Sequence, residues 1–191
     1  MLNFKKEYLK KRAEITRRLK QFSKIRNEHI FYELCFCLLT PQSHAERAQT
    51  ITRELRRKNF LDKNFNPKPI LKKNTRFHNN KTSYLLEAKK KFKQGLHLER
   101  DWLIKNIKGM GHKEASHFLR NTGFKNLAIL DRHILSNLKK HNVIEEIPKS
   151  LSKKTYLEIE DKFKKFSKKV KIPIDHLDLL FWYGETGRIF K

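Results

Sequence analysis

Apolar residues recur at helical spacing along most of this chain. In residues 4–22, large apolar side chains are separated by Lys and Arg, a pattern that predicts an amphipathic helix. Residues 28–39 are apolar nearly all round and predict a buried central helix or strand. Similar patterns predict further helices over residues 43–58, 80–93, 101–108, 113–121, 132–140, 151–169 and 175–183. Strand patterns are weak throughout, so the sequence predicts an all-α fold of roughly eight helices.

The breaks between these segments contain residues that commonly begin or interrupt helices. Pro41 and Ser43 stand where the helix over 43–58 is predicted to begin. Residues 61–76 hold two Pro and three Asn and are predicted to be a loop. Neither this loop nor the break near 23–27 proves separate domains. We therefore expect residues 1–191 to form one compact unit.

The charge of the chain narrows its function. Lys and Arg number 45 against 20 Asp and Glu, a formal net charge of +25. A domain this basic repels itself unless a polyanion lies against it, so nucleic acid is the first candidate partner. Hydrophobic residues make up 38% of the chain, enough for a core, which excludes full disorder. No apolar run approaches the ~18 residues that span a bilayer, and no signal-peptide pattern is present. We expect a cytoplasmic, nucleoid-associated monomer with no membrane contact.

The two cysteines, Cys35 and Cys37, lie within the apolar segment 28–39. Two thiolates are too few for a four-cysteine iron–sulfur cluster or zinc site. The nine His residues show no metal-binding spacing. We expect two small buried apolar side chains, no iron–sulfur cluster and no structural metal.

A glycine turn between two short helices is the first candidate site. Residues 101–108 and 113–121 flank Gly109-Met110-Gly111. Glycine permits positive φ and close approach of a foreign backbone, and the following helix presents N–H groups and its positive dipole end. This arrangement suits one phosphate of a nucleic-acid backbone, and it could also hold a monovalent cation. An ordinary helical hairpin with a glycine C-cap explains the same residues.

Lys113 and Asp131 are the candidate chemical groups near this turn. Lys113 stands just inside the second helix, with Ala115, Phe118 and Leu119 on the apolar side. It is predicted to face away from them, together with Ser116, His117 and Arg120. Asp131 ends an apolar run where an N-cap would begin the helix over 132–140. A basic residue on a solvated face and a structural cap are the plain alternatives for these two.

Residues 107–135 resemble the core of the helix-hairpin-helix DNA glycosylase superfamily, which includes endonuclease III and 8-oxoguanine DNA glycosylases. Gly109, Gly111, Lys113 and Asp131 fill the places of its Gly-x-Gly hairpin, its lyase lysine and its aspartate. The missing four-cysteine cluster departs from endonuclease III. The resemblance implies two helical lobes, residues 28–120 and residues 1–27 with 121–191, with the active site in a cleft between them.

Three further segments carry the resemblance. Residues 38–43 resemble the element that fills the gap left by a flipped base, and Gln42 matches the gap-filling position. Residues 76–81 resemble the loop-to-helix element that follows it. The end of the chain, from Phe181 to Lys191, is similar to that of archaeal-type 8-oxoguanine DNA glycosylases. Gln42 could instead be a polar first-turn residue of the helix over 43–58.

The resemblance implies a bifunctional base excision repair enzyme acting on 8-oxoguanine in double-stranded DNA without a required cofactor. Lys113 would attack C1′ and form a Schiff base, and an ionised Asp131 would stabilise the positive charge on the sugar. Trp182 could stack on the extruded base or pack in the core. The terminal Lys191 would read the oxidised base, unless it is a frayed end. Alternatives are a lyase for another oxidised base and a basic module that binds nucleic acid without chemistry.

Overall fold

A computed structural model describes the backbone of residues 2–190 and the side chains of residues 4–190. The described residues form ten α-helices and no strand, which confirms the predicted all-α class. The chain divides into two compact units, Ile25–Phe118 and Met1–Lys24 with Leu119–Lys191. These boundaries lie three and two residues before those implied by the resemblance.

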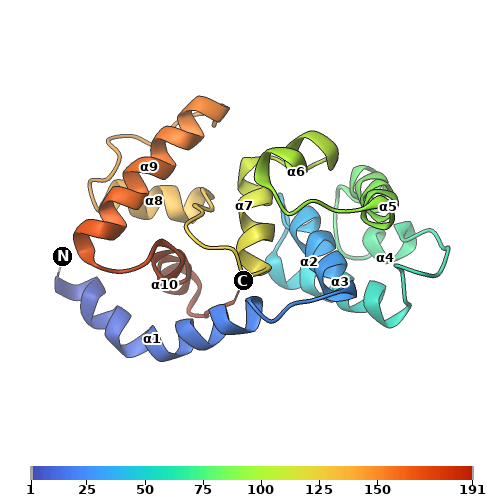
Figure 1. Cartoon of the computed structure of the whole chain (residues 1–191), viewed down its shortest axis with the longest axis horizontal. Coiled ribbons are helices and arrows are strands. Elements are labelled where there is room, and N and C mark those ends of the chain that lie inside the picture. Colours follow the sequence, from blue (N-terminus) through green and yellow to red (C-terminus); the bar gives the residue numbers. More distant parts are fainter. Residues whose placement is uncertain (1, 191) are drawn as a thin grey trace. The chain divides into compact units, whose positions relative to one another are not determined.

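The contiguous unit is built around α2 (Glu28–Leu39), which contacts α3 (Ala45–Arg57) and α5 (His78–Gln94) (Figure 1). α2 is buried over most of its length because its sequence is apolar on every side. Phe31 stacks on Phe60 with ring centroids 6.0 Å apart, and both are fully buried. α4 (Lys68–Lys72) packs on α5, and α6 (Arg100–Asn106) and the start of α7 (His112–Asn121) complete the unit.

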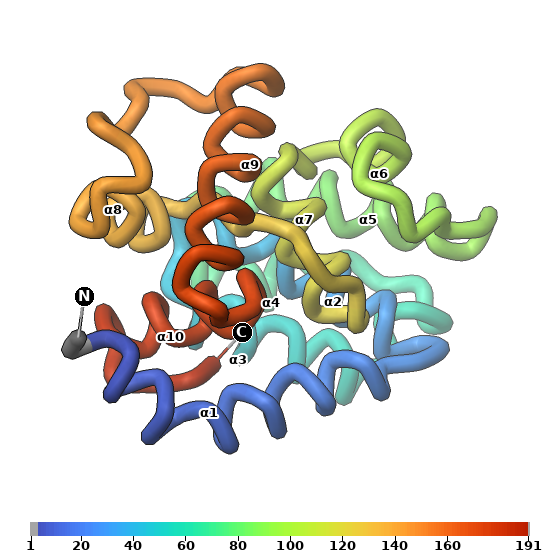
Figure 2. Tube along the Cα trace, turned by 60° about the vertical axis from the view of Figure 1, so that its left-hand side comes forward, coloured from blue at the N-terminus to red at the C-terminus, as the bar shows by residue number. Residues whose placement is uncertain are grey.

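The second unit joins the two ends of the chain. Its central helix is α10 (Ile174–Thr186), which contacts α1 (Leu2–Phe22), α8 (Arg132–Lys140) and α9 (Lys153–Val170). Figure 2 shows α10 running beside α1. Ile15, Leu138, Phe163 and Leu177 are fully buried members of one apolar cluster, so all four helices contribute to this core.

The predicted helix bounds were partly wrong. The helix predicted over 43–58 begins at Ala45, because residues 41–43 form a turn. The segment 61–76, predicted as a loop, contains the short helix α4, which starts at prolines that suit a first helical turn. Cys35 and Cys37 are buried free thiols, as expected, and burial raises the pKa of Cys35.

No helix among the described residues is long and apolar enough to cross a membrane.

Candidate active site

The glycine turn connects α6 to α7 and requires glycine at its first position. Gly109 adopts φ +83°, and a Cβ at this position would overlap the ring of Tyr84 on α5. Met110 is buried beneath the turn. Any larger residue at position 109 would have to displace Tyr84 and occupy a backbone region that L side chains disfavour. The hairpin conformation is thus fixed by the packing of its own unit.

The first turn of α7 carries a small charged network. The backbone N–H of Gly111 donates to Glu114 Oε2 at 3.2 Å. The other oxygen of Glu114, Oε1, lies 3.4 Å from Lys113 Nζ. A carboxylate at this place caps a helix N-terminus and interacts favourably with its dipole. The hairpin N–H group and the candidate nucleophile therefore share one carboxylate.

Lys113 is partly withdrawn from solvent, with 23% of its side chain exposed. Ser116, His117 and Arg120, predicted to face away from the apolar side of α7 together with Lys113, are all buried. Ser116 accepts a hydrogen bond from Arg100, and His117 packs edge-on against Phe36. Polar groups can be buried when they find such partners, so their polarity did not mark an exposed face.

Arg120 is the clearest case of a buried charge on α7. Its guanidinium lies 3.2 Å from the Asp178 carboxylate and above the ring of Phe22 at 5.0 Å. Both partners belong to the same unit as Arg120. An ion pair and a cation–π contact together replace part of the hydration that the guanidinium loses on burial.

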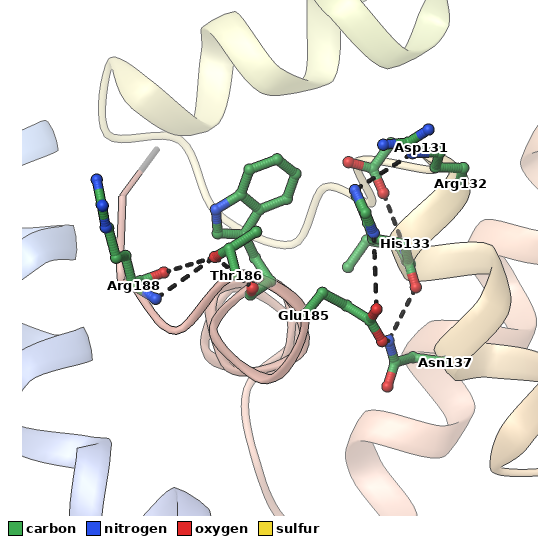
Figure 3. Close-up of polar contacts among 9 residues, drawn as sticks. Asp131, Arg132, His133, Asn137, Glu185, Thr186 and Arg188 are labelled. Atoms are coloured by element: carbon green, nitrogen blue, oxygen red, sulfur yellow. Dashed lines mark hydrogen bonds and ion pairs between the residues drawn. The ribbon is translucent and has the colours of Figure 1, made fainter. Parts of the chain in front are cut away.

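Asp131 is the N-cap of α8, as the sequence predicts. Its backbone is extended, and its Oδ1 accepts a hydrogen bond from Ile134 N at 2.8 Å. This hydrogen bond satisfies one of the free N–H groups at the start of α8 and orients the carboxylate. Figure 3 shows Asp131 beside Arg132 and His133, where Arg132 Nε lies 3.3 Å from His133 Nε2. The side chain is half-buried, and its catalytic role stays a prediction.

The end of α10 meets the start of α8 through polar contacts (Figure 3). Asn137 Nδ2 donates to Glu185 Oε1 at 3.1 Å, and His133 Nδ1 lies 3.9 Å from Glu185 Oε2. The Trp182 ring meets the His133 ring edge-on at 5.1 Å. Trp182 remains partly exposed, so core packing does not enclose it, and its role in base recognition stays a prediction.

Lys191 lies outside the described residues, but the residues before it are anchored. Ile189 packs against the apolar cluster of its unit. The carbonyl of Phe190 accepts a hydrogen bond from Arg18 Nε at 2.5 Å. Thr186 Oγ1 also bonds the chain at Arg188, as Figure 3 shows. These contacts hold the chain immediately before the predicted base-reading residue.

Gln42 lies in the turn between α2 and α3, ahead of the helix rather than in its first turn. Its side chain is exposed and its φ is +53°. The structure therefore excludes the alternative that Gln42 is an ordinary first-turn residue. Its gap-filling role stays a prediction.

Sequence reasoning missed Lys81 of α5, which is only 4% exposed and bonds the turn that carries Gln42. Burial, and to a lesser extent the charge of Lys113, lowers the pKa of Lys81 to about 8. As one of 45 basic residues, Lys81 offered no signal in the sequence.

Lys113 and Asp131 belong to different units, and their convergence in one cleft stays a prediction. Among the described residues, no group of three His, Cys, Asp or Glu side chains could hold a metal ion.

Comparison with known proteins relates this geometry to a family. A family model for 8-oxoguanine DNA glycosylase matches residues 15–172. An 8-oxoguanine DNA glycosylase/AP lyase of Fusobacterium nucleatum is 44% identical over 206 residues, with 97% of this chain and 95% of the relative covered. The Methanocaldococcus jannaschii glycosylase/lyase in complex with DNA containing 8-oxoguanine is 36% identical, with a TM-score of 0.87 and 100% of both chains covered. The 8-oxoguanine DNA glycosylase of Thermotoga maritima is 32% identical, again with a TM-score of 0.87, over 99% of this chain and 97% of that one. The chain belongs to the helix-hairpin-helix family of 8-oxoguanine DNA glycosylases.

Proposed function

We propose that this protein releases 8-oxoguanine from double-stranded DNA and then cleaves the strand at the resulting site. The observation that carries the proposal is a lysine at the first turn of the hairpin helix together with an aspartate N-cap on α8. This pair occurs in a chain that matches a DNA-bound relative over its full length.

The first chemical step is attack on the sugar of the extruded nucleotide. Neutral Lys113 Nζ forms a bond to C1′ as the bond between C1′ and the base breaks and the base departs. Positive charge develops on the sugar during this exchange, and the ionised Asp131 stabilises it. Asp131 suits this task because its N-cap hydrogen bond orients the carboxylate.

The second step follows from the covalent intermediate. Ring opening gives a Schiff base between Lys113 and C1′, which acidifies the proton on C2′. Loss of that proton expels the 3′ phosphate and cleaves the strand by β-elimination. Hydrolysis of the imine then returns Lys113. Lys113 and Asp131 supply the nucleophile and the charge stabilisation from one chain, so we propose a monomer that needs no cofactor.

Recognition of DNA and of the damaged base falls to other segments. The glycine hairpin, Gly109 and Gly111, would take a backbone phosphate and could hold a monovalent cation there. Oxidised guanine differs from guanine by an N7–H donor and an O8 acceptor. Trp182 would stack on the base and Lys191 would read these groups from the anchored end of the chain. As an enzyme of chromosomal DNA, it would work at the nucleoid in the cytoplasm.

The test is incubation with a duplex that carries 8-oxoguanine opposite cytosine, with and without borohydride. A trapped adduct with strand scission supports both the chemistry and the lesion. An adduct formed only with an abasic duplex would keep the lysine chemistry and reject 8-oxoguanine, and a panel of other oxidised bases would then identify the lesion. No adduct with either duplex would leave a basic DNA-binding module.

A further inference from the structure

Lys81 is buried in the contiguous unit, and its ammonium group is fully hydrogen-bonded. Its Nζ donates to Leu39 O at 2.7 Å, to Pro41 O at 2.8 Å and to Ser43 Oγ at 2.8 Å. An ammonium group has three donors, and here all three reach a single five-residue segment. Buried lysines are rare without partners, and these partners are neutral oxygens rather than a carboxylate. The side chain therefore bonds the turn and does not form an ion pair.

Two features of the segment that Lys81 bonds require stabilisation. Leu39 is the last residue of α2, where carbonyl groups lack helical partners and a positive charge complements the dipole. Two residues beyond Thr40, Gln42 adopts φ +53°, which is unfavourable for a residue other than glycine. Such a conformation persists only when its surroundings hold it. The residues bonded by Lys81, namely Leu39, Pro41 and Ser43, lie on both sides of Gln42 in the sequence.

The same network reaches the loop before α5. Ser43 Oγ lies 3.2 Å from Thr75 Oγ1, and Phe77 N donates to Thr75 Oγ1 at 3.4 Å. The turn is thus tied to α5 both through Lys81 and through Thr75. Gln42 itself takes no part in the network and leaves its side chain exposed.

We propose that Lys81 is a positioning residue for nucleotide extrusion, because its ammonium group holds the Leu39–Ser43 turn in the conformation that presents Gln42 to DNA. The inference rests on the proposed function, in which Gln42 occupies the gap left by the extruded nucleotide. Lys81 is buried and all three of its donors reach the turn, so it acts through the turn.

A role in the chemistry itself is the competing explanation, since the charges of Lys81 and Lys113 interact. The two explanations differ in which substrates depend on Lys81. Extrusion matters most when the lesion is stacked and paired, and least when the base is unpaired or absent. A chemical role would slow the reaction equally with all of these substrates.

The test compares Lys81→Met with Lys90→Met, a matched exposed lysine of the same helix. Single-turnover excision is measured with 8-oxoguanine opposite cytosine and with 8-oxoguanine in an unpaired bubble. Borohydride trapping is measured with a preformed abasic duplex. For Lys81→Met we expect a loss of about 30-fold on the paired lesion and less than about threefold on the other two substrates. Lys90→Met should match the wild type on all three.

A milder variant and a double mutant keep the result independent of folding. Ser43→Ala removes one of the three acceptors and should show the same substrate pattern with a smaller loss, about threefold on the paired lesion. If Lys81 acts through Gln42, then Lys81→Met should add little to Gln42→Ala on the paired lesion.

An equal loss on all three substrates, or full additivity with Gln42→Ala, would overturn the proposal. The failure of the proposed function looks different, because the wild-type protein itself would then leave 8-oxoguanine intact. The proposal about Lys81 requires a selective loss on the paired lesion relative to an active wild type. Normal abasic-site trapping by Lys81→Met is therefore not sufficient support by itself.

Discussion

Lys113 and Lys81 belong to the same unit and differ in how their ammonium groups are bonded. Lys81 is 4% exposed and donates to three oxygens at 2.7–2.8 Å. Lys113 keeps 23% of its side chain exposed and has one carboxylate oxygen at 3.4 Å. A fully bonded lysine is fixed in place, whereas a loosely held lysine can release its partner and move toward a substrate. The difference fits the proposed roles, in which Lys81 holds the turn and Lys113 performs the chemistry.

The largest expected effect comes from removing the loosely held amine. Lys113→Gln should lower base release and borohydride trapping by at least about 1,000-fold, because no other group replaces the nucleophile. DNA binding should persist. Lys108→Gln, which alters an exposed lysine of the same hairpin, is the control. Efficient trapping by Lys113→Gln would show that Lys113 is not the nucleophile.

Asp131 sharpens the comparison, because its side chain is hydrogen-bonded to the backbone like that of Lys81 but is expected to act on the reacting sugar like that of Lys113. Asparagine can keep the N-cap bond to Ile134 N while it removes the charge. Asp131→Asn should therefore reduce excision about 100-fold, with Tm within about 5 °C of the wild type. A gel assay and a thermal melt measure both. Near-normal excision by Asp131→Asn would show that Asp131 serves only as the N-cap of α8.

The sequence predicts the features that depend on neighbouring residues, and it does not predict those that depend on contacts between residues far apart in the chain. The bounds of α2 and α8 follow from local apolar patterns and, for α8, from its Asp131 cap. α4 has only five residues, too few for a helical period to emerge. The role of Lys81 depends on oxygens up to 42 positions away, which no local pattern reveals. Resemblance supplied Lys113 and Asp131, whereas the burial of Ser116, His117 and Arg120 required the packed structure.

The pH dependence of stability tests the burial of Lys81. Its folded pKa, about 8, lies below the unfolded value of about 10.4, so between these values the unfolded state binds more protons. The unfolding free energy contributed by this group therefore rises with pH across that window. The difference between wild type and Lys81→Met should increase by about 2 kcal/mol from pH 7 to pH 10. Urea unfolding measures it, with Lys90→Met as the control. A constant difference would show that Lys81 is more accessible than the structure indicates.

A third lysine, Lys191, extends the comparison to base recognition. A tag fused directly after Lys191 would crowd this residue. We expect 8-oxoguanine excision to fall about tenfold and abasic-site cleavage to stay near the wild-type rate. Removing the tag with a protease that leaves no extra residue should restore excision. Equal inhibition of both reactions would argue against a role in base recognition.

The smallest expected effect concerns the partner of Lys113. Glu114→Gln keeps an oxygen for Gly111 N–H but removes a negative charge from the end of α7 that is expected to meet phosphate. Affinity for a duplex with a stable abasic analogue should rise about threefold at low salt and less at high salt. Glu87→Gln, an exposed carboxylate of α5, measures the general effect of lost negative charge. An affinity gain no larger than that of Glu87→Gln would show that the charge of Glu114 has no specific effect on DNA binding.

The division of the chain also has a consequence for its synthesis. Ile25–Phe118 is contiguous and can close its core as soon as those residues leave the ribosome. α1 emerges first, but its contacts with α10, the last of the described helices, can form only when almost the whole polypeptide has been made. The unit with the hairpin and Lys113 should thus mature before the unit with Asp131. A nascent chain halted before residue 174 would carry a folded hairpin unit and an α1 that lacks its contacts with α10, and chaperones would have to shield the exposed apolar surface until translation resumes.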